Sequence, residues 1–194
     1  MNLDSDSIKR HIEESRSRAA ELAGGLTAEQ LIQRPEPSQW SIAECIAHLN
    51  ATANTVQGLV AEGVERGKRE KILGAGPFDI GTKGRFLVWF AEPPPKVKIT
   101  APRRVQPPAK IDQPLQVFEG FMAVQDGWER LLRESAGLDL ARIKVGPRLS
   151  AFRVRLAAVW PWMMAHQRRH LLQAEKVREA VLSQSAMLKN AASS

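Results

Sequence analysis

Proline and glycine divide the chain into segments that can be helical and one long segment that cannot. Seven of the 12 prolines lie between Pro93 and Pro114, and residues 67–83 add four glycines and a further proline. Proline removes a backbone donor and fixes φ, so this stretch cannot form regular helix or a central strand. We therefore predict that residues 67–113 form an extended connection, long enough to act as a lid over a site. Within it, residues 86–90 fit a helical turn better than a strand, since no partner strand is visible.

Four segments with helical periodicity flank this connection, at residues 4–23, 41–65, 114–135 and 152–189. We expect Asp6 or Ser7 to cap the first segment, and a capping box formed by Ser41 and Glu44 to start the second. Pro161 lies inside the fourth segment, so that helix either begins near it or bends there. Four amphipathic helices with one long crossover are typical of a four-helix bundle. The prediction is an all-α fold in a single domain spanning residues 1–194.

The chain carries 28 basic against 21 acidic residues, and the excess falls in two blocks, residues 92–110 and 142–155. Neither block contains a nucleic-acid recognition pattern, and the chain has no tyrosine for base stacking. We interpret both blocks as solvated loop charges, with attraction of anionic ligands as the alternative, and we expect no nucleic-acid partner. The longest uncharged apolar run is far too short to span a membrane, and the acidic start lacks a secretory apolar region. A cytoplasmic protein without a membrane partner is expected.

Two of the four histidines, His166 and His170, stand one helical turn apart. They lie within a stripe that is apolar at both ends and should face the bundle interior, where imidazoles need hydrogen-bond partners or a shared cation. His48 lies on the shoulder of the apolar stripe of the second predicted helix and can reach inward. Three neutral imidazoles suit a divalent Zn, Ni or Fe ion; the alternative is three isolated histidines. His11 belongs to no motif and is expected to face solvent.

Two segments around these histidines resemble a known family. Residues 40–49, WSIAECIAHL, resemble the W-S-x-x-E-x-x-x-H-L pattern of the DinB-like superfamily. Residues 166–173, HQRRHLLQ, resemble its H-x-x-R-H-x-x-Q pattern. The resemblance implies a four-helix bundle, often a homodimer, in which three histidines hold a divalent metal. Carried onto this sequence, the implied metal ligands are His48, His166 and His170.

Five further residues are candidates for the surroundings of this site. Glu44 and Gln173 each stand one turn from an implied ligand and are expected to orient imidazoles. Trp40 is expected to pack where the second helix starts rather than to touch a substrate. Cys45, the single cysteine, neighbours His48 in projection, although a small buried helix cysteine is the commoner case. Arg169 matches the family's arginine and is expected to bind an anionic group or, more often, a carboxylate on a neighbouring helix.

The resemblance implies two kinds of metal-dependent enzyme, a thiol-dependent S-transferase and a hydrolase, either of which would act on a small-molecule substrate. In the first kind a low-molecular-weight thiol is the expected co-substrate, because a bound metal can deprotonate a thiol. No residue can be named as general base from the sequence. The alternative is a non-enzymatic metal-binding or stress-associated bundle, in which the ion mainly ties two helices together.

Overall fold

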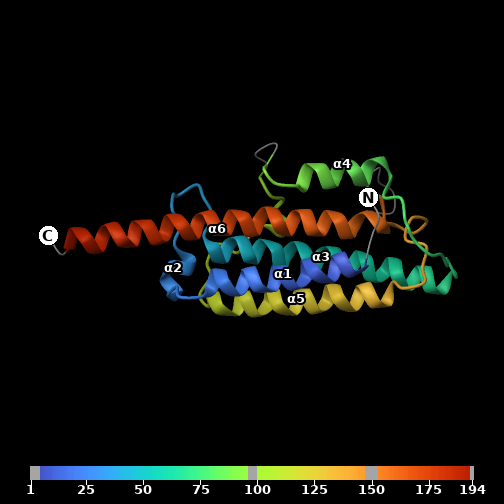
Figure 1. Cartoon of the computed structure of the whole chain (residues 1–194), viewed down its shortest axis with the longest axis horizontal. Helices are drawn as coiled ribbons and strands as arrows, with labels where there is room; N and C mark the ends of the chain where they lie inside the picture. Colours follow the sequence, from blue (N-terminus) through green and yellow to red (C-terminus); the bar gives the residue numbers. More distant parts are fainter. Residues whose placement is uncertain (1–4, 96–99, 147–152, 193–194) are drawn as a thin grey trace.

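The computed structural model describes residues 5–95, 100–146 and 153–192, and four long helices dominate it (Figure 1). These are α1 (Ser5–Ala23), α3 (Ile42–Arg69), α5 (Pro114–Glu134) and α6 (Val159–Ala192). The shorter elements are α2 (Ala28–Ile32), α4 (Gly81–Ala91), the 3₁₀ turns η1 (Arg103–Val105) and η2 (Leu156–Ala158), and the antiparallel strands β1 (Lys144–Val145) and β2 (Val154–Arg155). The predicted all-α four-helix bundle is confirmed.

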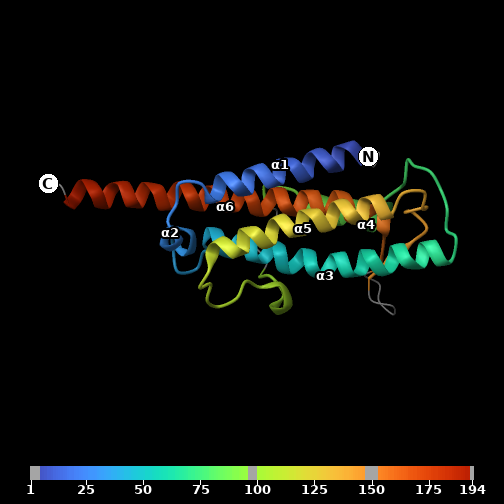
Figure 2. The same cartoon turned by 90° about the horizontal axis from the view of Figure 1, so that it is seen from below.

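The four long helices do not form a simple up-and-down bundle. α1 and α3 each pack against both α5 and α6, so α1 and α3 occupy opposite corners. α1 and α6 run in one direction and α3 and α5 in the other, as Figures 1 and 2 show. Because α3 and α5 are parallel neighbours, the chain must travel back along the bundle between them. The Pro/Gly-rich connection makes that return and carries α4 and η1.

This connection is shorter than the predicted range 67–113, and it contains more helical structure than expected. α3 continues to Arg69, and α4 contains the run 86–90 that the sequence favoured as helix. α4 packs on α6 and η2. Its approach to η2 requires glycine, because a Cβ at Gly84 would lie 2.6 Å from the Ala158 Cβ. The outer face of α4 exposes Phe86 and Trp89.

Local sequence signals fix where most of the helices begin. At the start of α3, the Glu44 N–H donates to Ser41 Oγ at 3.2 Å and the Ser41 N–H donates to Glu44 Oε2 at 2.8 Å, which confirms the capping box. α6 begins at Val159, so Pro161 lies in its first turn, where its missing N–H has no intrahelical partner to lose. The predicted caps of α1 are wrong, because Asp6 and Ser7 lie inside that helix.

The expectation that His11 faces solvent is wrong. His11 is 6% exposed, because it shares the buried face of α1 with Ile8, Ile12 and Ser15. Its Nε2 lies 3.1 Å from Gln167 Oε1, which also accepts a hydrogen bond from Ser15 Oγ at 3.2 Å. The Gln167 amide in turn donates to Gln125 Oε1 at 3.3 Å. A buried polar network therefore links α1, α6 and α5 through the centre of the bundle.

The buried state of His11 predicts an acid-dependent loss of stability. Burial, with a smaller contribution from the charge of Arg168, lowers the pKa of His11 from 6.5 to about 4. The unfolded chain therefore binds more protons than the native chain between these values, and the free energy of unfolding falls as the pH drops through that window. This residue alone accounts for about 3 kcal/mol. Denaturant titrations at pH 7 and pH 4 should show that the free energy of unfolding falls less in His11→Gln than in the wild type, by about this amount. Equal losses in the variant and the wild type would contradict this.

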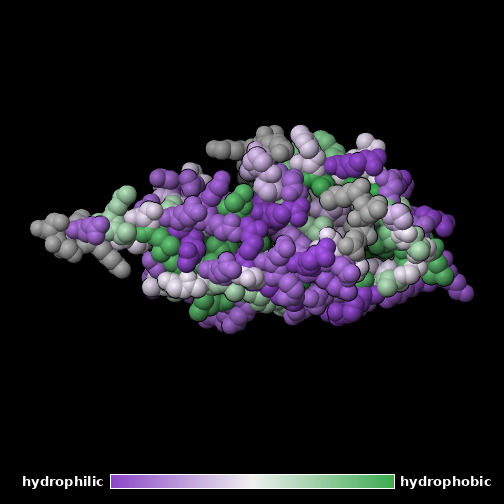
Figure 3. Space-filling view, in the orientation of Figure 1, coloured by the Kyte–Doolittle hydropathy of each residue, from purple (hydrophilic) through white to green (hydrophobic). Residues whose placement is uncertain are grey.

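The structure supports the interpretation of the basic blocks as solvated charges for most, but not all, of the members that it describes. Hydrophilic residues cover much of the face in Figure 3. Lys96, Lys98 and Arg148 lie outside the described residues. The exposed members of the blocks are Arg103, Arg104, Lys110, Arg142 and Lys144, whereas Arg153 and Arg155 are partly buried. Among the described residues, no helix is both long and apolar enough to cross a membrane.

Candidate metal centre

Two helices that are far apart in the sequence bring three imidazoles together. His48 lies in the second turn of α3, and His166 and His170 stand one turn apart on α6, which packs against α3. One ring nitrogen from each histidine lies within 4.8 Å of the others. His48 Nε2 and His166 Nε2 are 3.4 Å apart. Two nitrogens bound to one tetrahedral Zn²⁺ at about 2.1 Å would be separated by about 3.4 Å.

The outer nitrogens of two rings are held by oxygen acceptors. His48 Nδ1 lies 2.6 Å from the Val105 carbonyl oxygen in η1, and His170 Nδ1 lies 3.0 Å from Gln173 Oε1. An oxygen acceptor requires N–H at Nδ1, which leaves the Nε2 lone pair of each ring free. Gln173 therefore contacts the imidazole that the sequence assigned to it. The Val105 carbonyl was not predicted.

All three imidazoles are neutral near pH 7. Burial lowers the pKa of His48, and burial together with the neighbouring imidazoles lowers the pKa of His166 well below its ordinary value. Burial, followed by repulsion from His48 when that imidazole is protonated, lowers the pKa of His170 to about 3. A neutral imidazole presents the lone pair that a metal ion needs, whereas a protonated one cannot bind it. The cluster therefore has the protonation state of a metal-binding site.

Two tryptophans form aromatic walls around the imidazoles. The Trp40 ring lies 5.0 Å from the His48 ring and 6.0 Å from the His170 ring, between centroids. Trp162 stacks on His166 at 5.1 Å with an angle of 19° between the planes. Trp40 thus packs where α3 starts, as expected, and also contacts two site histidines. Trp162 was missed, although its position one turn before His166 places both residues on one helix face.

Glu44 does not orient an imidazole, contrary to expectation. Its carboxylate is held by Arg34, which donates through Nε at 2.8 Å and also through Nη2, and by the Ser41 backbone N–H. Burial raises the pKa of Glu44, but these hydrogen bonds and the Arg34 charge outweigh it, so the pKa is lowered overall. The capping box directs this side chain toward the helix start and away from His48, whose ring is oriented by Val105 instead.

Cys45 lies in the apolar core, whereas Arg168 and Arg169 contact the return connection. Cys45 is fully buried in an apolar cluster with Ile42, Ile46 and Phe121, and burial raises the pKa of its thiol. Among the described residues, the candidate metal-binding group consists of the three histidines without Cys45. Arg168 pairs with a carboxylate, donating to both oxygens of Glu92 at 2.8 and 2.6 Å. Arg169 donates to the Phe90 carbonyl at 3.2 Å.

The donor set fits a divalent ion of the Zn, Ni or Fe class. The Nε2 lone pair of His48 lies 3.4 Å from the Nε2 of His166, so it is satisfied either by an N–H of His166 or by a cation that the two rings share. Nitrogen ligands with oriented outer N–H groups are the usual surroundings of such ions. The three histidines therefore suit the divalent metal ion that the sequence implied.

Comparison with known proteins decides the family. The sequence model of the DinB superfamily matches residues 11–174, which include all three site histidines. The chain belongs to the DinB superfamily. Among solved structures, YfiT from Bacillus subtilis is similar, with a TM-score of 0.58 and 13% identity over 89% of this chain and 85% of that one. YfiT is described as a probable metal-dependent hydrolase with an unusual four-helix bundle topology. At this identity the likeness shows the fold alone.

No curated protein matches the chain. In this structure the return connection brings the Val105 carbonyl to His48, and an ion pair between Glu92 and Arg168 joins the connection to α6.

Proposed function

We propose that this protein is a metal-dependent enzyme in which His48, His166 and His170 hold a divalent ion. The observation that carries this proposal is the convergence of three neutral imidazoles, two of which have their outer nitrogens held by oxygen acceptors. Such outer contacts fix the tautomer and the ring orientation that a metal needs. The resemblance of YfiT, itself described as a probable metal-dependent hydrolase, supports the same class.

Each group at the site would have a separate role in this activity. A divalent ion held by three imidazoles would lower the pKa of a bound water or thiol toward neutrality and polarise a substrate carbonyl. The Val105 carbonyl and Gln173 would keep two Nε2 atoms turned inward. Trp40 and Trp162 would exclude water from two sides of the cluster and present apolar surface to a small-molecule substrate.

Two reaction types remain as finer proposals, hydrolysis and transfer to a low-molecular-weight thiol. Both would use a water or a thiol that an ion held by the three histidines would activate, so the histidine cluster supports them equally. The homodimer, the cytoplasmic location and the single-domain organisation stay predictions. The non-enzymatic alternative, in which the ion mainly joins α3 to α6, uses the same ligands and differs only in turnover.

Turnover with and without metal tests the proposal. We expect the metal-loaded protein to hydrolyse an activated aryl ester or to conjugate a small thiol to an aryl halide. Chelation should abolish this activity, and Zn²⁺, Ni²⁺ or Fe²⁺ should restore it. His166→Ala should be inactive, whereas His11→Gln, a control that removes a buried histidine outside the cluster, should keep its activity. Turnover that survives chelation would contradict the proposal, and bound metal without turnover would favour the non-enzymatic bundle.

A further inference from the structure

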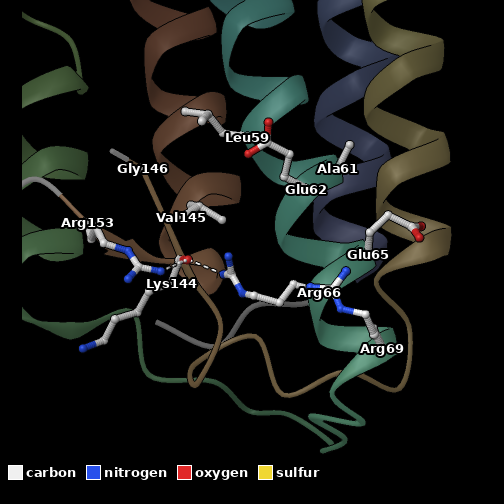
Figure 4. Close-up of a pocket in the computed structure, with 10 residues that line it drawn as sticks. All are labelled: Leu59, Ala61, Glu62, Glu65, Arg66, Arg69, Lys144, Val145, Gly146 and Arg153. Atoms are coloured by element: carbon white, nitrogen blue, oxygen red, sulfur yellow. Dashed lines mark hydrogen bonds between the residues drawn. The ribbon is translucent and has the colours of Figure 1, made fainter. Parts of the chain in front are cut away.

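A cavity lies at the end of α3 that is far from His48, where this helix meets β1 (Figure 4). Its volume is about 520 Å³. Glu62, in its wall, follows His48 by 14 residues on α3, a separation of about 21 Å at the rise of a helix. The cavity is therefore distinct from the histidine cluster. Its lining combines apolar and charged residues: Leu59, Ala61, Glu62, Glu65, Arg66, Arg69, Lys144, Val145, Gly146 and Arg153.

Two arginines converge on one backbone oxygen in this cavity. Arg66 Nη2 and Arg153 Nη2 both donate to the Lys144 carbonyl, at 2.5 and 3.0 Å, from opposite sides in Figure 4. Sharing one acceptor brings two positive charges close together, and a carbonyl dipole neutralises them only in part. An anion in the cavity would relieve this repulsion and accept from the remaining N–H groups.

One of these arginines also has a donor without a partner. Arg153 Nε is shielded from solvent and, within the described part of the chain, meets no hydrogen-bond acceptor. A buried guanidinium N–H left unpaired is costly, and such groups are normally satisfied by protein, water or ligand. Because Arg153 lines the cavity, a turn of its side chain would bring this shielded N–H to an oxygen-rich ligand bound there.

The lining also sets the charge and shape of the occupant. Four cationic side chains line the cavity, together with the carboxylates of Glu62 and Glu65. The Glu65 carboxylate is paired with Lys68, whose Nζ lies 3.5 Å from Glu65 Oε1. Leu59, Ala61 and Val145 provide an apolar wall. The cavity therefore matches a dianionic head joined to a small apolar body. A phosphate monoester has this charge and offers several strong acceptors to guanidinium groups.

We propose that this cavity is a second binding site, which takes a small organic phosphate monoester. The phosphate is held by Arg66 and Arg153, with Lys144 and Arg69 adding positive charge, and the organic group rests on Leu59 and Val145. This site is separate from the metal centre and does not depend on the function proposed for it.

Calorimetric titration of the full chain with phenyl phosphate tests the proposal. We expect saturable binding to the wild type and about tenfold or greater weakening in Arg153→Gln, because a charged hydrogen-bond donor is lost. Arg130→Gln, which removes an exposed arginine on α5, is the matched control and should bind like the wild type. Inorganic phosphate should bind more weakly than phenyl phosphate, because it lacks the apolar body.

Arg153 also holds the backbone at Lys144, so a second variant tests the site independently of that contact. Glu62→Gln removes an exposed negative charge from the cavity wall, and we expect binding about twofold to fivefold tighter at low ionic strength. His166→Ala should bind phenyl phosphate as the wild type does. No saturable binding, unchanged affinity in both Arg153→Gln and Glu62→Gln, or loss of binding in His166→Ala would each overturn the proposal.

Discussion

His166→Ala is expected to leave a folded protein that no longer retains a divalent ion. His166 is central to the cluster, because its Nε2 lies 3.4 Å from that of His48 and it shares α6 with His170. Substituting residues that only orient metal ligands already lowers metal affinity by about 10–100-fold. We therefore expect the loss of a ligand to weaken metal binding by more than about 100-fold. Elemental analysis after gel filtration should find about one ion per wild-type chain and almost none per variant chain.

In His166→Ala, the melting temperature should no longer depend on the divalent ion. At a free-ion concentration 100 times the Kd, binding stabilises the native state by about 2.7 kcal/mol. In a protein of this size that corresponds to a Tm shift of about 5–10 °C. Chelation should therefore lower the Tm of the wild type and of His11→Gln, but not that of His166→Ala. A chelator-dependent shift of equal size in His166→Ala would contradict the assigned ligands.

Trp160→Ala is expected to cause the largest loss of stability of the substitutions considered. Trp160 is fully buried at the start of α6 and packs edge-on against Trp128, with the ring centroids 5.7 Å apart. Truncation removes this contact and leaves a cavity that the flanking helices cannot fill, which costs about 3–5 kcal/mol. Urea denaturation should show a lower midpoint with little change in slope.

Trp89→Ala is the matched control for this prediction. Trp89 lies on the outer face of α4 and is 55% exposed, so its removal should change the free energy of unfolding by less than about 1 kcal/mol. Equal losses from the two substitutions would contradict the packing described for the start of α6. Trp160→Ala should also keep one metal ion per folded chain, since Trp160 makes no ring contact with the histidine cluster within the described residues.

The parts of the fold that the sequence predicted are those with local signals. The capping box of Ser41 and Glu44 involves residues three apart, and the proline at Pro114 marks the first residue of α5. The pairing of His166 with His170 follows from helical spacing alone. The place of His48 beside them required the family resemblance, because no local pattern specifies which helices become neighbours.

The errors have both local and long-range causes. His11 shares the buried stripe of α1 with Ile8 and Ile12, so the helical periodicity of this segment is itself a signal for its burial. The Val105 carbonyl lies 57 residues from His48 and is a backbone group, so no side-chain pattern could reveal it. Glu44 was assigned to an imidazole because it stands one turn from His48, but its capping role and Arg34 occupy both of its oxygens.

The most direct test of this account is X-ray absorption spectroscopy on the wild type loaded with one equivalent of Zn²⁺. Coordination by the three imidazoles predicts three nitrogen neighbours at about 2.0–2.1 Å, with the multiple-scattering features of imidazole rings and no sulfur from Cys45. His166→Ala should lose this spectrum. A first shell dominated by oxygen, or a sulfur neighbour at about 2.3 Å, would show that His48, His166 and His170 do not form the metal centre.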